Sequence, residues 1–359
     1  MKKSLFFTFA LLCTVVQGTW AQTMVKNESE LAQAVKTDGA NILLTGDIEL
    51  SQAITIQGDN GGAVSVTINM NGKKLTDKTS VGQTTAGCVF IVPSGSELNL
   101  SNGTIADVSN ITGNNTKYIA GAIVNDGTAT LSSVTISGCK GLLGGAIKNN
   151  QGAKLNLNTC TFDSNEASTK DGFDSGNGGV IWNAGTLVLF DTKFQDCKAV
   201  KGAAIYNDAS GSISMGDNNS TTSFYSNKAS GDGGIFTYAG STTTLSGVTI
   251  TGNQAKIVGG GGINNYGTLT LDGCTITGNT SKHNGGGIWN SGDSKLSMQG
   301  ANTVTDNNGL NNADNVFLIT GIVIAVTGSL EGSTIGISMQ NPDVFTSGFG
   351  ANNDKEPLT

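Results

Sequence analysis

The sequence contains no arginine: all 20 basic residues among its 359 positions are lysines, and the formal net charge is −7. Arginine provides the bidentate donor fork with which proteins hold phosphate groups and guanine, and an acidic chain without a basic patch is repelled by a phosphate backbone. We therefore expect no nucleic-acid partner. The single histidine, His283, excludes metal sites with several histidine ligands and leaves one possible base for a histidine-dependent triad.

Proline and charge are also scarce, with 3 prolines and 13 % charged residues, whereas glycine is abundant at 52 residues. So much glycine without a Gly-X-Y period and with almost no proline excludes collagen. A hydrophobic fraction of 37 % with this modest net charge argues against disorder. The chain is long enough to bury a large core without disulfides or metal. It is an Asn-, Thr-, Ser- and Gly-rich chain that needs many tight turns.

The first residues have the pattern of an export signal. Lys2-Lys3 form a basic segment, residues 5–16 an apolar one, and Thr19-Trp20-Ala21 a small-x-small cleavage site before Gln22. We therefore expect an exported protein, located at the cell surface, in the outer membrane or outside the cell.

A lipoprotein signal with Cys13 as the lipidated residue is the alternative, although Leu12 stands where a small residue is expected. The remaining long apolar run, residues 316–326, is much shorter than the roughly 20 residues that a membrane helix needs. We expect no transmembrane helix.

From Gly121 onward one unit recurs roughly every 27 residues, which is typical of a repeat architecture. The unit opens with a Gly-Gly-small-Ile-x-Asn phrase, continues with a Gly turn and a short alternating strand such as 267–271, and closes with segments such as 161–165 and 275–279. The opening apolar residue is assigned to Ile123, Ile147, Ile181, Ile205, Phe236, Ile263 and Ile288.

Each unit thus holds three strands that are too short to form a core alone, so the units must stack. Strands that pair with their equivalents in the next coil, at the usual spacing of about 4.8 Å, form an all-β parallel β-helix. Stacking predicts a buried ladder of Ile136, Phe162, Phe194, Phe224, Ile250, Ile276 and Val304, and an asparagine ladder at a bend of Asn125, Asn149, Asn183, Asn207, Asn265 and Asn290.

The open end of the stack needs a cap. Asn27 followed by Glu30 predicts a helix start, and Leu31, Ala34 and Val35 form one apolar face. We divide the chain into a signal peptide at 1–21, a cap with irregular first coils at 22–120, regular repeats at 121–309, and last coils at 310–359 with room for the chain to continue.

Five cysteines remain after the signal. Cys160 and Cys274 share one ladder position and Cys139 and Cys197 another, at least two coils or about 10 Å apart. That separation exceeds the ~7 Å Cα limit of a disulfide. Cys88 is the fifth, and we expect all of them to be small core residues without a disulfide-linked partner.

The Gly-Gly-Ala-Ile phrase at 144–147 and the Phe-x-x-Asn phrases at 162–165 and 224–227 resemble the repeats of the chlamydial polymorphic membrane proteins. Similar repeats occur in surface proteins of the pectin-lyase-like class. The resemblance covers roughly residues 120–310 and implies a right-handed parallel β-helix, and a role as an autotransporter adhesin. Several copies depart from it by carrying Ile-Thr-Gly-Asn in place of Phe-x-x-Asn.

Many β-helix proteins cleave acidic polysaccharides, so paired carboxylates are candidates for a catalytic acid and base. Asp191 and Asp196 are expected on one coil with Asp163 on the coil before, and Asp163 and Asp196 as diagonal neighbours approach the roughly 6.5–9.5 Å that inverting hydrolysis requires. The missing arginine and the net charge argue against a uronate lyase. Solvated turn aspartates are the simpler interpretation, and we expect no catalytic site.

Trp182, Tyr206 and Trp289 share the position between the opening Ile and the Asn, which alternation points away from the core. Exposed aromatic rings beside Asn-rich turns suit contact with a sugar or a protein, so these are the candidate ligand-binding residues. Rings that lie flat over neighbouring strands are the structural alternative. Lys148, Val124 and Asn264 fill the same position in other coils.

The longest insertion, residues 171–178, brings Asp171, Asp174 and Asn177 together at the short spacing of a Ca²⁺ loop. No bidentate Glu closes this loop, so a plain turn is the preferred interpretation. We expect no cofactor, with Ca²⁺ as the one candidate.

These observations favour a surface or secreted adhesin that binds a glycan or a host-surface protein. A carbohydrate-active enzyme, either a polysaccharide lyase or a glycoside hydrolase, and a purely structural module of a larger surface protein are the alternatives.

Overall fold

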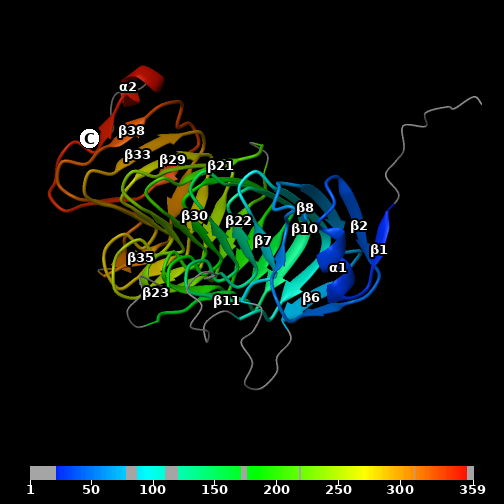
Figure 1. Cartoon of the computed structure of the whole chain (residues 1–359). Coiled ribbons are helices and arrows are strands. Elements are labelled where there is room, and N and C mark those ends of the chain that lie inside the picture. The colour runs from blue at the N-terminus through cyan, green and yellow to red at the C-terminus, as the bar shows by residue number, and fades with distance from the viewer. Residues whose placement is uncertain are drawn as a thin grey trace, which may run out of the picture.

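The computed structural model describes residues 22–77, 87–109, 120–170, 176–217, 220–310 and 312–353, so the proposed signal at 1–21 lies outside the described residues. These residues form an elongated parallel β-solenoid whose coils stack along one axis (Figure 1). Each regular coil contributes strands to three sheets, here named A, B and C. The prediction of an all-β parallel solenoid with three strands per coil is confirmed.

Sheet A has 22 strands and forms the longest wall of the solenoid. They are β1 (Thr23–Val25), β2 (Ala40–Leu44), β3 (Ile48–Leu50), β5 (Ser65–Asn69), β6 (Lys74–Asp77), β8 (Glu97–Ala106), β10 (Thr128–Ser137), β13 (Lys154–Asn158), β14 (Thr161–Asp163), β17 (Thr186–Phe190), β18 (Lys193–Gln195), β21 (Ser212–Met215), β22 (Ser223–Tyr225), β25 (Thr242–Ser246), β26 (Thr249–Thr251), β29 (Thr268–Asp272), β30 (Thr275–Thr277), β33 (Lys295–Gln299), β34 (Thr303–Thr305), β38 (Ile324–Val326), β39 (Thr334–Ile335) and β41 (Thr346–Ser347).

Sheets B and C are narrower. Sheet B has 11 strands: β4 (Ile54–Thr55), β7 (Phe90–Val92), β9 (Ile123–Asn125), β12 (Ile147–Asn149), β16 (Ile181–Asn183), β20 (Ile205–Asn207), β24 (Ile235–Thr237), β28 (Ile263–Asn265), β32 (Ile288–Asn290), β37 (Val316–Leu318) and β40 (Ile337–Met339). Sheet C has eight: β11 (Lys140–Gly141), β15 (Glu166–Ala167), β19 (Lys198–Lys201), β23 (Lys228–Asp232), β27 (Gln254–Ala255), β31 (Thr280–Ser281), β35 (Asn308–Gly309) and β36 (Asn312–Ala313). Only β35 and β36 pair antiparallel among the described strands.

The core is built from ladders of identical or similar side chains. Phe162, Phe194 and Phe224 are fully buried and stack face to face, with ring centroids 5.1 and 4.7 Å apart. Ile136 precedes them in register, and Ile250, Ile276 and Val304 follow. The predicted core ladder is therefore confirmed at every position.

Two asparagine ladders hold the bends of the coils. In the predicted ladder, the amide Nδ2 of Asn125 donates to Asn149 Oδ1 at 2.8 Å, Asn149 to Asn183 at 2.7 Å, and Asn183 to Asn207 at 2.8 Å. All of these side chains are buried. A second ladder follows sheet A, where each Nδ2 donates to the next Oδ1 along Asn227, Asn253, Asn279, Asn307 and Asn315. The predicted ladder is interrupted by Thr237, which stands between Asn207 and Asn265, and it resumes with the bond from Asn265 to Asn290. Apart from Nδ2 of Asn290, the amides of both ladders are thus hydrogen-bonded to neighbouring coils.

The corner between sheets C and B requires glycine. Gly144 and Gly178 adopt φ of 72° and 70°, a left-handed conformation that side chains disfavour. A Cβ at either position would also collide with the carbonyl oxygen three residues later, that of Ile147 or Ile181. The Gly-Gly-small-Ile-x-Asn phrase is therefore the sequence of one tight corner followed by a sheet B strand.

The prediction of Phe236 as the buried opening residue of the fifth copy is wrong. In the fifth copy Ile235, not Phe236, pairs with Ile205 and Ile263 in the buried ladder, and Phe236 pairs with Tyr206. Both residues are apolar, so either one fits the sequence pattern. The Gly233-Gly234 pair identifies Ile235 as the inward residue only when the geometry of the corner is known. The correction places Phe236 in the same column as the candidate ligand-binding residues.

Helix α1 (Glu28–Ala34) covers the first coil, as predicted (Figure 1). Asn27 Oδ1 accepts the backbone N–H of Glu30 at 2.9 Å, and the Glu30 carboxylate accepts the N–H of Lys26 at 2.8 Å. Leu31 is fully buried beneath the helix. The short helix α2 (Phe349–Asn352) lies at the other end, and no helix among the described residues is long and apolar enough to cross a bilayer.

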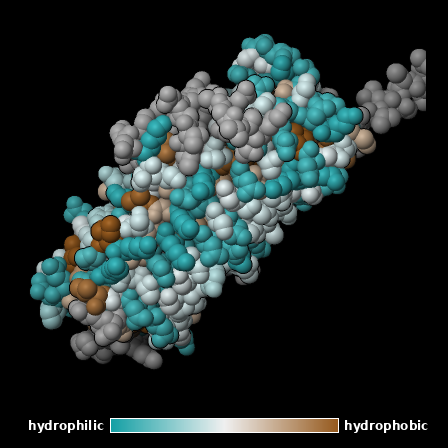
Figure 2. Space-filling view, turned by 90° about the horizontal axis from the view of Figure 1, so that it is seen from below, coloured by the Kyte–Doolittle hydropathy of each residue, from teal (hydrophilic) through white to brown (hydrophobic). Residues whose placement is uncertain are grey.

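The face seen in Figure 2 is mostly hydrophilic, and its hydrophobic residues lie in small separate patches. This distribution follows from the strands themselves, in which inward apolar residues alternate with outward Thr, Ser, Asn and Lys. Concentrations of aromatic residues on the outside of the coils are therefore the exception to be explained.

Candidate functional site

The outer side of sheet B carries one column of residues that departs from this polar pattern. Strand pairing places Lys148, Trp182, Tyr206, Phe236, Asn264, Trp289 and Phe317 side by side, one from each successive coil. The predicted alignment of Trp182, Tyr206 and Trp289 in one column is correct.

A second column adds two tyrosines. Tyr238 lies 6.3 Å from both Tyr206 and Phe236, and Tyr266 lies 5.6 Å from Phe236 and 5.8 Å edge-on to Trp289, measured between ring centroids. Tyr206 and Phe236 stack at 4.9 Å. We call Trp182, Tyr206, Phe236, Tyr238, Tyr266 and Trp289 the aromatic face. It runs along the solenoid axis over successive coils.

The aromatic face is only partly open to solvent. Tyr238 is 42 % exposed and both tryptophans are half-buried, but Tyr206 is only 5 % and Phe236 only 3 % exposed. The expectation that alternation exposes this column is therefore wrong for Tyr206. Residues at the ends of two sheet C strands contact part of this column, at Phe236 and Asn264.

Those sheet C residues are charged. Lys201, the last residue of β19, places Nζ 5.6 Å from the centroid of Phe236, which is cation–π distance. Asp232 ends the next strand of sheet C in register with Lys201, and its Oδ1 accepts the Nδ2 of Asn264 at 3.0 Å. Lys148 Nζ lies 5.2 Å from the Trp182 ring.

Burial governs the protonation of these groups. It raises the pKa of the Asp232 carboxyl, which Lys201 and the Asn264 amide partly offset. Burial also raises the pKa of Tyr266, and the negative charge of Asp232 raises it further. Burial lowers the pKa of Lys148, and the negative charge of Asp126 partly offsets this effect. The Asp232 carboxyl, whose pKa is raised, is therefore a polar group beside the aromatic rings.

Two buried polar atoms of this site have no hydrogen-bond partner among the described residues. They are Oδ1 of Asn264, an acceptor, and Nε1 of Trp289, a donor, on residues paired in adjacent strands. Buried polar atoms are nearly always satisfied in folded proteins, so an unpaired acceptor and donor in adjacent coils suit a group that both donates and accepts.

The candidate catalytic aspartates do not form one cluster. Asp191 and Asp196 lie at left-handed corners before and after β18, with φ of 45° and 54°. The Asp191 carboxylate accepts both the N–H and the hydroxyl of Thr221, at 2.7 and 2.9 Å, and so serves the turn of the next coil.

Asp163 is paired with Gln195, the residue before Asp196, so these two aspartates are diagonal neighbours as predicted. The Asp163 carboxylate accepts the hydroxyl of Ser164 at 2.7 Å. The expectation that these are turn aspartates without a catalytic role stays a prediction.

The Ca²⁺ candidate is only partly described. Asp171 and Asp174 lie outside the described residues, and Asn177 is 4 % exposed, with its carbonyl oxygen accepting the N–H of Gly144 at 2.9 Å. Within the described part of the chain, no three His, Cys, Asp or Glu side chains are grouped as metal ligands.

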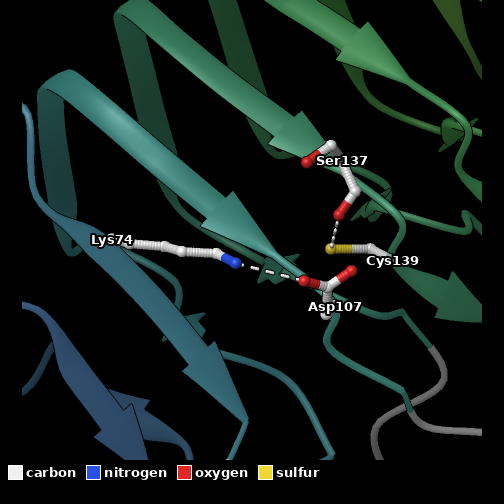
Figure 3. A network of polar contacts seen from close by, with 4 residues as sticks. All are labelled: Lys74, Asp107, Ser137 and Cys139. Atoms are coloured by element: carbon white, nitrogen blue, oxygen red, sulfur yellow. Dashed lines mark hydrogen bonds and ion pairs between the residues drawn. The ribbon is translucent and has the colours of Figure 1, made fainter.

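The five described cysteines are free and buried. Burial raises the pKa of Cys88, Cys139 and Cys197 to about 12 and that of Cys160 and Cys274 to about 11. Cys139 shows the arrangement (Figure 3): its Sγ contacts the carbonyl of Ser137 at 3.6 Å, and the nearby Asp107 is paired with Lys74 at 3.1 Å. Asp107 raises the thiol pKa further, and Lys74 lowers it.

We expect a thiol reagent at pH 8 to label none of these five cysteines in the folded protein, because only about one thiol in a thousand or fewer is ionised. After denaturation, the chain that starts at Gln22 should yield five thiols and the uncleaved chain six, since Cys13 is the sixth. Absorbance of the released chromophore gives both counts. A Lys193→Cys variant, exposed on β18, is the control that reacts at once; rapid labelling of Cys139 or Cys197 would contradict the structure.

Sequence reasoning missed Lys201, Asp232, Tyr238 and Tyr266. Tyr238 and Tyr266 each lie three residues after the opening Ile of their coils, so the repeat contained a signal for them. Lys201 and Asp232 belong to sheet C, and nothing in the repeat indicates that the ends of these strands cover sheet B.

Comparison with known proteins adds no family. No family model and no curated protein matches the chain. A solved structure titled "L. reuteri 53608 SRRP" is similar over 89 % of this chain and 95 % of that one, at 15 % identity and a TM-score of 0.35. A likeness at this level says nothing about function.

Proposed function

We propose that the protein is an exported adhesin-type binding module, and that it binds a glycan along the aromatic face. The observation that carries the proposal is the set of six rings gathered on one outer side of a coil stack whose other outward residues are mostly polar. Aromatic rings with partly wet edges are suited to the apolar faces of sugar rings. The signal-like residues 1–21 support export.

Polar groups beside the rings suit a ligand rich in hydroxyls. Lys148 and Lys201 lie beside the rings of Trp182 and Phe236, and their ammonium groups can donate to sugar hydroxyls. The rings lie on successive coils along the axis, so an extended chain of sugars can contact the more exposed ones, Trp182, Tyr238 and Trp289, in turn. A protein ligand is the alternative that the experiment below separates.

The test is glycan-array and cell binding with Trp182→Ala and Trp289→Ala. Each half-buried ring should contribute about 1–2 kcal/mol of contact, so each variant should bind roughly 5- to 30-fold more weakly. Tyr225→Ala, which removes a 48 % exposed ring on sheet A, is the matched control and should bind normally. Unchanged binding after loss of both tryptophans would remove the proposed site, and binding to cells stripped of glycans would favour a protein ligand.

A further inference from the structure

The outer side of sheet C carries a groove with lysines on three successive coils. Lys198 of β19 is directly paired with Lys228 of β23, and Lys256 follows β27, the next strand of the sheet. These lysines border a cavity of about 460 Å³, which we call the lysine groove. Ala167 and Ala199 line it as well, and their small, buried side chains leave the space open to a partner.

The protein does not balance the positive charge of the lysine groove. Lys198 and Lys228 lie side by side in adjacent strands, where like charges repel. Glu166 lines the groove in the coil before Lys198, but its carboxylate is 3.5 Å from Lys140, which lies one coil further away. Among the described residues, the three lysines of the groove form no ion pair. Three unpaired lysines at one cavity, in a chain of net charge −7, favour a negatively charged partner.

Apolar side chains accompany these lysines. Val200 lines the groove from the same strand as Lys198, and Ile257, the residue after Lys256, is 62 % exposed. A partner that covers this surface therefore gains by placing apolar side chains beside its negative groups. Nucleic acids and polysaccharides carry negative charge without aliphatic side chains, whereas a segment of protein can carry both.

The spacing of the lysines suits an extended segment of protein chain. Coils stack about 4.8 Å apart, so three successive coils span about 10 Å. An extended chain advances about 3.3 Å per residue, so acidic residues spread over about four positions match the three lysines. The hydroxyl of Ser230, which also lines the groove, donates to the Ala199 carbonyl at 3.4 Å, and its oxygen can accept an N–H group of such a segment.

We propose that the lysine groove is a protein-binding surface for an extended acidic segment of a partner protein. The Asp or Glu side chains of that segment pair with Lys198, Lys228 and Lys256, and its apolar side chains contact Val200 and Ile257. The surface consists of other residues than the aromatic face, so this inference does not depend on the proposed glycan binding. Because exposed charges carry most of the attraction, binding should weaken as salt rises.

The experiment measures fluorescence anisotropy of a labelled peptide in which glutamates alternate with leucines, at low and at physiological salt. The Lys198→Gln/Lys228→Gln/Lys256→Gln variant should bind this peptide about ten-fold or more weakly at low salt. The same peptide with glutamine in place of glutamate should bind neither protein. The matched control variant is Lys154→Gln/Lys193→Gln/Lys295→Gln, which removes three exposed lysines of sheet A and should bind the acidic peptide normally.

A second variant tests the apolar contact. Ile257→Ser should weaken binding of the leucine-containing peptide about five-fold and leave a peptide with serine in place of leucine unaffected. Val344→Ser is its control, because Val344 is similarly exposed, at 68 %, and lies in the last coils, outside the groove.

The outcomes separate this inference from the proposed function. Equal losses in the two triple variants, equal binding of the glutamate and glutamine peptides, or no binding of the acidic peptide would overturn the lysine groove as a protein-binding surface. A DNA duplex or a sulfated polysaccharide that competes more strongly than the serine-containing acidic peptide, with Ile257→Ser unaffected, would identify a plain polyanion site and overturn it too. The lysine variant should keep its glycan binding, so either proposal can fail without the other.

Discussion

Replacing Asn183 by Leu is expected to destabilise the protein by about 3–4 kcal/mol. Asn183 Oδ1 accepts from Asn149 at 2.7 Å and its Nδ2 donates to Asn207 Oδ1 at 2.8 Å and to the Ser212 carbonyl at 3.2 Å. Leucine has a similar volume but bonds to none of them. Each buried group left unsatisfied costs about 1–3 kcal/mol, and at least two are affected.

Denaturant unfolding followed by circular dichroism measures this loss as a lowered midpoint. Asn290→Leu is the matched control at the end of the same ladder. Its Nδ2 already has no partner in the described structure and faces Leu318 in the next coil, so only the bond from Asn265 is lost. We expect a loss of about half that at Asn183; equal losses would mean that side-chain volume, and not the amide bonds, matters at these bends.

Phe194→Ala is expected to cost about 3–5 kcal/mol, the usual range for deleting a buried ring. Phe194 is fully buried between Phe162 and Phe224, which lie nearly parallel to it at interplanar angles of 8° and 1°. Its removal leaves a cavity that two flanking rings held by their own coils cannot fill.

Phe194→Ile is the informative comparison, because isoleucine occupies the same ladder position at Ile250 and Ile276. It should cost clearly less than Phe194→Ala. Coils of a solenoid can unfold separately, so hydrogen exchange of the coils on either side of Phe194 should be measured together with the denaturant midpoint. If Ala and Ile are equally harmful, ring stacking rather than filled volume stabilises the ladder.

The solenoid could be predicted because translation along the axis places equivalent residues in contact. Phe162, Phe194 and Phe224 are recognisable as one ladder from their place in the repeat, and the same holds for the asparagines at the bend. The angle at which two sheets meet has no such signature. Lys201 and Asp232 of sheet C contact Phe236 and Asn264 of sheet B, and the place of these contacts depends on the angle between the sheets, not on the repeat.

The lone error of register has the same origin. Ile235 and Phe236 are both large and apolar, so either one satisfies an inward position when coils are read singly. Pairing with Ile205 and Ile263 decides between them only after the neighbouring coils are aligned.

Both asparagine ladders are oriented in one direction. In each asparagine–asparagine bond the Nδ2 of an earlier coil donates to the Oδ1 of a later one, from Asn125 to Asn207 on one side and from Asn227 to Asn315 on the other. Each asparagine side chain therefore offers its Nδ2 to the asparagine of the following coil and its Oδ1 to that of the preceding coil, although in the second ladder Nδ2 also donates to a backbone carbonyl of the preceding coil. The two ends of each ladder are therefore chemically unequal: side-chain donors face the C-terminal end of the stack and side-chain acceptors face the N-terminal end.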